Sequence, residues 1–263
     1  MTASRLISSP ANPAYKAWLR LATQPRQVRL QGKTLAEGAH LAAAWLQADR
    51  PIEAVLVSAA IGGGERDSLV AQLARKATVY ELSPGLYNGL GLVENGIGLA
   101  LVVAVPATSD RPLHGDALYL DGVQDPGNAG ALLRVAAAAG VRHVLASPSS
   151  AALWTHKVLR AAQGAHLLLD LREGIPVEVL PLAGIEWIGT SLTADQTLWQ
   201  AALAPRPLGW VVGAEGSGAS AAALAACSRL IRIPMAPGVE SLNVATAAAV
   251  CLFERQRRLG EAP

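Results

Sequence analysis

The sequence predicts an α/β protein of two domains, the second built on a largely parallel β-sheet. The first observation is length, because 263 residues suit two domains of ordinary size. The second is composition: 51% hydrophobic and 16% charged residues allow a substantial core. The third is pattern, since short apolar strands alternate with Ala-rich helices through the C-terminal half. That alternation is typical of parallel strands covered by helices on both faces.

A polar segment with two prolines and a glycine, residues 105–115, indicates a linker between the domains. We therefore expect a first domain at 1–106, a linker at 107–115 and a second domain at 116–263. In the first domain the pattern predicts helices and strands in alternation, which suggests a small α/β layer fold. The helices are expected at 14–22, 34–48 and 67–76, and the strands at 52–57, 78–82 and 97–105.

In the second domain the same alternation is expected to continue to the C-terminus. An ordinary Rossmann fold is an alternative, but no GxGxxG follows the first strand of either half, and the glycine-rich loops follow late strands instead. The strands are expected at 117–120, 143–146, 185–189, 209–212 and 229–233, and the helices at 129–139, 153–162, 219–226 and 242–258.

Three segments of the second domain combine a strand, a turn-rich loop and a helix. Residues 118–140 read LYLDGVQDPGNAGALLRVAAAAG, residues 208–220 read LGWVVGAEGSGAS, and residues 233–246 read IPMAPGVESLNVAT. Loops that end at a helix N-terminus leave backbone N–H groups free to face a ligand. Glycines in the second loop permit close backbone approach and unusual dihedral angles. Tight turns alone would explain any one of these loops, but not all three in this order.

These segments resemble the three signature motifs of the SpoU/TrmH RNA ribose methyltransferases, within the SPOUT class. Order and spacing agree, and the resemblance covers the chain from about residue 115 to the end. The matching residues are Asn128, Gly130 and Arg134 in the first motif; Gly213, Glu215, Gly216 and Gly218 in the second; and Ile233 to Met235 with Ser241 to Val244 in the third.

The resemblance implies a trefoil-knotted sheet, S-adenosylmethionine as cofactor, and methyl transfer to a ribose 2′-hydroxyl of RNA. Most of the rate gain in such a reaction is expected from placement and electrostatics. The strand-end loops are then expected to hold the adenosine. The cofactor contacts carried over are Thr190, Ser191, Leu192, Gly213, Ala214, Gly218, Ile233, Met235 and Leu242.

Arg134 is the first residue to which the resemblance assigns a catalytic part. A literal base role is unfavourable, because a guanidinium hardly ever loses a proton at neutral pH. We therefore expect a phosphate clamp that positions the nucleotide and stabilises the developing alkoxide. An interfacial ion pair is the structural alternative.

Four further polar residues complete the expected catalytic set, and each has a structural alternative. Asn128 is expected to orient Arg134 or the ribose, or to cap the helix after it. Glu215 is expected to hold Asn128 or Arg134 or to face the sulfonium, or else to be a solvated turn residue. Ser241 and Asn243 each suit a helix cap and a contact with substrate or cofactor.

The N-terminal segment is basic, with six basic and no acidic residues up to residue 36. Such a segment suits attraction to RNA phosphates, although a solvated helical arm would have the same charge. Segments within 12–38 resemble the substrate-binding domain of many family members, which is similar to a ribosomal-protein-like RNA-binding fold. Glu94-Asn95-Gly96 departs from the Pro-Gln-Gly that is common there. The expected RNA contacts are Arg5, Lys16, Arg20, Arg26, Arg29 and Lys33.

Other classes of site find little support in the sequence. Cys227 and Cys251 lie far apart without a CxxC, and the histidines lack zinc-ligand spacing, so no metal is expected. No apolar run reaches the length of a membrane span, and the N-terminus lacks the apolar core of a signal peptide. A cytoplasmic protein is therefore expected. The resemblance also implies a homodimer through the last helix, although a helix buried within one chain would look the same.

The sequence therefore favours a ribose 2′-O-methyltransferase acting on RNA. Ribosomal RNA is preferred over tRNA, because the separate N-terminal domain resembles that of rRNA-directed members. Two alternatives stay open. One is a base methyltransferase of the same fold, and the other is a non-catalytic RNA-binding or ribosome-assembly factor that retains the fold.

Overall fold

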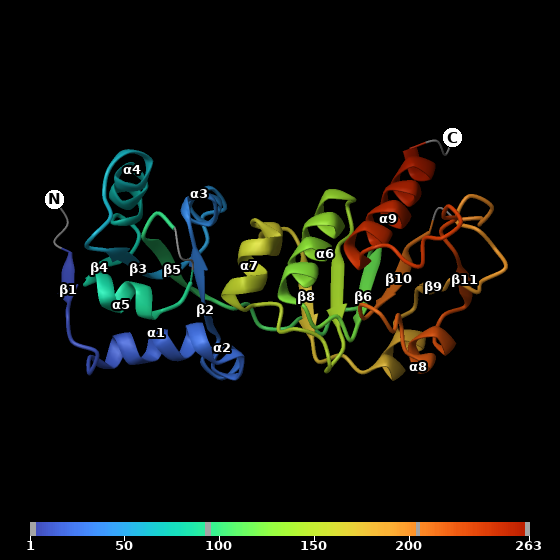
Figure 1. The fold of residues 1–263 in the computed structure, drawn as a ribbon, viewed down its shortest axis with the longest axis horizontal. Coiled ribbons are helices and arrows are strands. Elements are labelled where there is room, and N and C mark those ends of the chain that lie inside the picture. Colours follow the sequence, from blue (N-terminus) through green and yellow to red (C-terminus); the bar gives the residue numbers. More distant parts are fainter. Residues whose placement is uncertain (1–3, 93–95, 204–205, 261–263) are drawn as a thin grey trace. The chain divides into compact units, whose positions relative to one another are not determined.

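The structure is a computed structural model, and it describes residues 4–92, 96–203 and 206–260. The chain forms two compact units (Figure 1). The first comprises Met1–Ala107 and Trp154–Leu167, and the second comprises Thr108–Leu153 and Leu168–Pro263. The expected boundary near residue 107 coincides with the first division. The segment Trp154–Leu167, expected in the second domain, instead clusters with the first unit.

A five-stranded sheet in the order β1-β4-β3-β5-β2 forms the centre of the first unit. Strands β1, β4 and β3 pair in parallel, whereas β5 pairs antiparallel with both β3 and β2. Leucines and valines of the central strands are fully buried, as expected for a sheet covered on both faces. The strands are β1 (Arg5–Ile7), β2 (Lys33–Glu37), β3 (Ile52–Ser58), β4 (Thr78–Leu82) and β5 (Leu99–Ala104).

Helix α1 shows how the sequence defines its own boundaries in this unit. The Asn12 side chain caps the helix by accepting from the Ala14 N–H, and Pro13 occupies the first turn. Its buried residues Tyr15 and Trp18 are three apart, so they lie on one face. The helices of the unit are α1 (Pro13–Thr23), α2 (Pro25–Gln31), α3 (Ala39–Gln47), α4 (Gly64–Leu73), α5 (Pro84–Gly89) and α7 (His156–Ala162).

The helix expected at 34–48 is wrong in its first part. Lys33–Glu37 forms strand β2 because it pairs with β5, and only Ala39–Gln47 is helical. Gly38 separates them with a φ of +102°, a conformation that glycine adopts readily. Strand β1 and helices α2 and α5 were not expected from the pattern, which is weak over such short segments. Glu94 and Asn95 lie outside the described residues.

Helix α7 completes the core of the first unit, although it is distant in sequence. It packs against β2, and its residues Val158 and Leu159 are fully buried. The Thr34 hydroxyl donates to the carbonyl of Trp154, and the Arg160 guanidinium donates to the carbonyl of Leu92 at 3.2 Å. The first unit therefore needs this later segment to cover β2.

Protonation of His156 is expected to destabilise the protein at low pH. Burial, with repulsion from Lys157 and Arg160, lowers the pKa of His156 from 6.5 to about 4. The unfolded chain therefore binds more protons between these values, so the stabilisation is present above pH 6.5 and is lost as pH falls toward 4. The loss corresponds to about 3 kcal/mol of unfolding free energy. Urea unfolding of wild type and His156→Gln from pH 7 to 4 measures it, and parallel pH curves would contradict the assignment.

The second unit contains a six-stranded sheet in the order β11-β9-β10-β6-β7-β8. Every pairing is parallel, which confirms the α/β fold with a parallel sheet. The expected strands are present, and β8 was missed because its sequence, Asp-Leu-Arg-Glu, is mostly polar. The strands are β6 (Ala117–Asp121), β7 (His143–Ala146), β8 (Asp170–Glu173), β9 (Glu186–Thr190), β10 (Leu208–Gly213) and β11 (Arg229–Ile231).

Helices cover this sheet in two layers. Helix α6 (Pro126–Ala138) packs against α9 (Val244–Gly260), and the two lie side by side on one face of the sheet (Figure 1). Helix α8 (Ala221–Ala225) and the 3₁₀ segment Val177–Leu182 contribute to a buried cluster with Tyr119 and Trp187. Because all six strands are parallel, their carboxyl ends meet at one edge of the sheet. In the described part of the chain, none of the helices combines the length and apolar character required to cross a membrane.

A buried ion pair fixes α9 at the opposite edge. The Arg255 side chain is 3% exposed, and its Nε donates to Asp116 Oδ2 at 3.0 Å. Asp116 Oδ1 also accepts from the backbone N–H of Leu208 at 2.9 Å, where β10 begins. This carboxylate therefore joins the amino ends of β6 and β10 to the last helix.

Candidate active site

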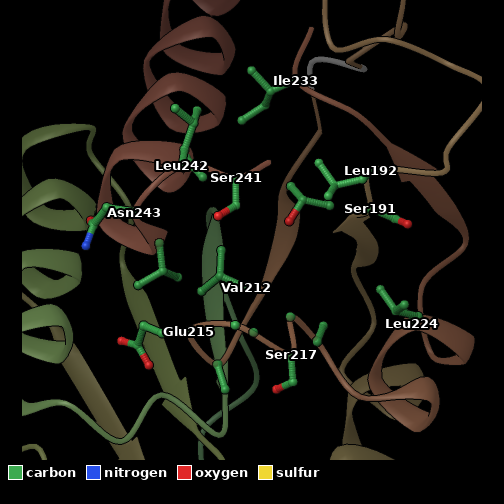
Figure 2. Close-up of a pocket in the computed structure, with 18 of the residues that line it drawn as sticks. Ser191, Leu192, Val212, Glu215, Ser217, Leu224, Ile233, Ser241, Leu242 and Asn243 are labelled. Atoms are coloured by element: carbon green, nitrogen blue, oxygen red, sulfur yellow. The ribbon is translucent and has the colours of Figure 1, made fainter. Parts of the chain in front are cut away.

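A cavity of about 600 Å³ lies at the carboxyl edge of the second unit's sheet. The segments that follow β9, β10 and β11 form its wall. Figure 2 shows Glu215 and Asn243 on one side, with Ser191, Leu192 and Leu224 opposite. Open α/β sheets commonly bind ligands at this edge, outside the carboxyl ends of their strands.

All nine residues that the resemblance assigned to cofactor binding line this one cavity. Glu215, Ser241 and Asn243, expected in catalysis, line it as well. Sequence reasoning missed several apolar contributors, such as Val212 and Leu224, because nothing distinguishes them from ordinary core residues. Gly216 and Val244, matched as motif residues, also line the cavity, and the lining residues not singled out from the sequence are Thr193, Val212, Ser217, Ala219, Leu224 and Ala247.

The loop after β10 turns its backbone toward the cavity. It closes on itself through a hydrogen bond of 2.9 Å from the Gly218 N–H to the Ala214 carbonyl. Gly216 and Gly218 have φ values of +89° and +71°, which only glycine adopts without strain. A Cβ on Gly213 would overlap the Ala219 nitrogen and the Gly218 carbonyl carbon. This compact loop leaves room for a ligand to approach the backbone closely.

A chain of hydrogen bonds joins the three segments that the sequence singled out. Asn128 Nδ2 donates to Glu215 Oε1 at 2.6 Å, and Asn243 Nδ2 donates to Asn128 Oδ1 at 2.8 Å. Asn128 therefore uses both ends of its amide, one toward each of the other segments. The result is a polar network of Asn128, Glu215 and Asn243 beside the cavity, hereafter the Asn–Glu–Asn network.

Capping resolves two of the alternatives left by the sequence. Asp125, and not the Asn128 side chain, caps α6, because its Oδ1 accepts from the Asn128 N–H at 2.7 Å. The Asn128 amide is thus available for the network. Asn243 caps the last helix, since its Oδ1 accepts from the Ala245 N–H at 2.9 Å, and its Nδ2 also donates to Asn128 Oδ1.

Arg134 is not part of this network. It is exposed on α6, does not line the cavity, and its side chain makes no hydrogen bond or ion pair with another described residue. Six residues turn an α-helix by about 600°, so Arg134 and Asn128 face different directions. The structure therefore separates the expected catalytic Arg134 from the other four residues of its own chain.

The six basic residues of the N-terminal segment lie on four elements of the first unit. Lys16 and Arg20 are four residues apart on α1 and share a face. Lys33 is paired with Glu53 at 2.6 Å, with both side chains substantially exposed. The other five, Arg5, Lys16, Arg20, Arg26 and Arg29, are exposed and have no acidic partner among the described residues.

Metal and thiol chemistry have little basis in the described part of the chain. No group of three or more His, Cys, Asp or Glu side chains there is arranged to hold a metal ion. Burial raises the pKa of the Cys227 and Cys251 thiols to about 12, so neither is a reactive thiolate at neutral pH.

Known proteins are similar to this chain in sequence. Residues 117–253 match the model of the SpoU rRNA Methylase family. A Synechocystis protein named as an uncharacterized tRNA/rRNA methyltransferase is 32% identical over 260 residues, covering 96% of this chain and 93% of the relative. The Bacillus subtilis 23S rRNA (guanosine(2553)-2′-O)-methyltransferase RlmP is 30% identical over 254 residues, covering 94% of this chain and 97% of that protein.

Solved structures of RNA methyltransferases have a similar fold. The crystal structure of an RNA 2′-O ribose methyltransferase has a TM-score of 0.80 and 30% identity, covering 98% of this chain and 100% of that one. The SpoU methyltransferase AviRb of Streptomyces viridochromogenes, solved with AdoMet, has a TM-score of 0.84 and covers 96% of this chain and 100% of its own, at 24% identity. The likeness to AviRb concerns the fold. Together the relatives, the fold and the cavity define an α/β methyltransferase. The chain belongs to the SpoU rRNA Methylase family.

Proposed function

We propose that this protein transfers a methyl group from S-adenosylmethionine to a ribose 2′-hydroxyl in ribosomal RNA. The observation that carries the proposal is the Asn–Glu–Asn network, which joins all three expected motifs at the wall of one cavity. Support comes from RlmP and other relatives, which are named as 23S rRNA 2′-O-methyltransferases. Support for the cofactor comes from AviRb, whose structure contains AdoMet.

The cavity fits a nucleoside-sized cofactor. Its volume of about 600 Å³ lies within the usual range for small-molecule sites. Apolar side chains such as Ile233 and Leu242 would give an adenine ring apolar contacts, and the glycine loop would offer it backbone hydrogen-bonding groups. S-adenosylmethionine, when bound, supplies an electrophilic methyl group. We assign the nine residues carried over from the resemblance to holding it.

Placement is the main task left to the protein's own side chains. The Asn–Glu–Asn network presents amide and carboxylate groups whose geometry is set before substrate arrives, the condition under which polar groups stabilise developing charge best. We assign Asn128 and Asn243 to orienting the ribose hydroxyl. Glu215 holds the Asn128 amide in the required orientation, and Ser241 provides a further hydroxyl at the cavity wall.

A homodimer is part of this proposal. Arg134 does not reach the network of its own chain, so a site that uses it needs a second copy. Helix α9, packed beside α6, carries Phe253 at 45% exposure and is a suitable contact surface.

The first unit, with its exposed basic side chains, is assigned to binding RNA phosphates. Cytoplasmic location follows from the ribosomal RNA substrate, and the knotted path of the chain stays a prediction.

Ribose-methylation mapping of total RNA tests the function directly. Cells lacking this gene are expected to lose a 2′-O-methyl mark in ribosomal RNA, and wild type but not Asn128→Ala is expected to restore it. Loss of the Asn128 amide removes the link between the motifs, with an expected decrease in kcat on the order of 100-fold. Asn88→Ala, at an exposed asparagine of α5, is the matched control and should restore the mark.

Other outcomes separate the alternatives. If cells lacking the gene lose a base methylation and keep all ribose marks, the protein is a base methyltransferase of the same fold. Cofactor binding with no change in any RNA methylation would favour a non-catalytic RNA-binding factor. Either result would refute the proposed reaction.

A further inference from the structure

Asp121 lies at the carboxyl end of β6 and holds the far end of the glycine-rich loop. Its Oδ2 accepts a hydrogen bond of 2.6 Å from the backbone N–H of Ser220. In the parallel ladder Asp121 stands opposite Gly213, the last residue of β10. Asp121 therefore bridges the point where the loop leaves the sheet and the point where it returns to α8. A carboxylate bound to a backbone N–H makes one of the stronger hydrogen bonds in proteins.

Asp121 itself is rigidly placed. It belongs to the β6 ladder, and the next residue, Gly122, donates its N–H to the Ser147 hydroxyl at 3.0 Å. Ser147 is in turn held by its own N–H, which donates to the Leu120 carbonyl at 2.9 Å. The Asp121 carboxylate is therefore held in place by the sheet, and it in turn holds the glycine-rich loop.

The loop has a second attachment to the same stretch of chain. Glu215, near its beginning, accepts from Asn128, and Ser220, at its end, donates to Asp121. The loop residues between these two attachments, residues 216–219, all line the cavity. Asp121 does not line it, so its influence on a ligand acts through the loop.

We propose that Asp121 is a positioning residue that holds the glycine-rich loop in its cofactor-binding conformation. The inference rests on the proposed function, since it takes S-adenosylmethionine as the ligand of the cavity. Without the carboxylate, the Ser220 N–H loses its acceptor and the loop keeps one attachment instead of two. A loop that must be ordered on binding lowers affinity, because part of the binding free energy is used for ordering.

The test measures the Kd for S-adenosylmethionine by calorimetry, without RNA, in Asp121→Ala and Asp121→Asn. Asp121→Ala is expected to weaken binding about tenfold, as for loss of one charge-assisted hydrogen bond. Asp121→Asn keeps an oxygen acceptor and is expected to recover most of the affinity. In turnover assays the KM for S-adenosylmethionine should rise while the KM for RNA stays unchanged.

Asp116→Ala is the matched control, because Asp116 lies at the amino end of the same strand and also accepts from a backbone N–H of β10. It should lower the melting temperature without changing the Kd. An equal change in Kd for Asp116→Ala and Asp121→Ala would contradict the positioning role, because the effect would then come from a general loss of stability. An unchanged Kd in Asp121→Ala would also overturn it.

Hydrogen exchange separates the positioning role from the proposed function. In the cofactor-free protein, faster exchange of the loop amides 214–220 in Asp121→Ala than in Asp116→Ala is expected from the anchor alone. Unchanged exchange would contradict the anchor. If the wild-type protein binds no S-adenosylmethionine, the proposed function fails, and the exchange of the loop amides then shows by itself whether Asp121 anchors the loop.

Discussion

Replacing Gly213 with alanine is expected to abolish cofactor binding. The added Cβ would overlap backbone atoms of Gly218 and Ala219, which cannot move aside as a flexible side chain can. The loop after β10 would have to open, and the loop backbone is a large part of the cavity wall. We expect the Kd for S-adenosylmethionine to rise at least about 100-fold, because an ordered loop and its hydrogen bonds are lost together. Calorimetry on the purified variant measures the change.

Two other glycines provide controls for this experiment. Gly209 lies on the same strand, and its added Cβ would overlap the Trp187 ring in the core, so Gly209→Ala reports destabilisation away from the cavity. Gly260→Ala, at the end of α9, meets no atom within 4 Å and should be neutral. If Gly213→Ala bound cofactor like wild type, the loop would not form the binding surface.

Much of the second unit could be predicted because its elements differ in local pattern. The apolar strands of 117–120 and 143–146 and the Ala-rich helix between them need no tertiary information to recognise. The proximity of Asn128, Glu215 and Asn243 could also be expected. Each residue follows a parallel strand, and the carboxyl ends of parallel strands lie at the same edge of the sheet. Which atom each side chain uses depends on loop geometry, which the sequence does not encode locally.

The features that the sequence did not predict depend on packing between residues far apart in the chain. Residues 34–48 have a helical apolar spacing throughout, but pairing with β5 makes the first part a strand. Helix α7 has no local signal for the unit that it joins, since its place depends on contacts with β2 more than 100 residues earlier. Asp121 was not singled out because its carboxylate acts on a backbone N–H 99 residues away. Tertiary context overrides local propensity at residues 34–37, and it determines the partners of α7 and Asp121.

Replacing Arg134 with alanine is expected to decrease kcat about 1,000-fold while the Kd for S-adenosylmethionine stays unchanged. The loss of kcat follows if the guanidinium binds a phosphate and stabilises the developing alkoxide in the transition state. The unchanged Kd follows because Arg134 does not line the cavity. Arg134→Lys should recover little activity, since an ammonium cannot make the paired hydrogen bonds of a guanidinium. Near-normal turnover of Arg134→Lys would contradict the clamp.

Mixed dimers decide which chain supplies Arg134. Co-expressed Arg134→Ala and Asn243→Ala chains pair at random, so about half of the dimers contain one chain of each kind. If Arg134 acts on the partner's cavity, each mixed dimer has one site with both residues intact, and about a quarter of wild-type activity returns. If Arg134 acts within its own chain, every site lacks one residue and the mixture is as inactive as either variant. The exposed position of Arg134, apart from the Asn–Glu–Asn network of its own chain, favours the first result.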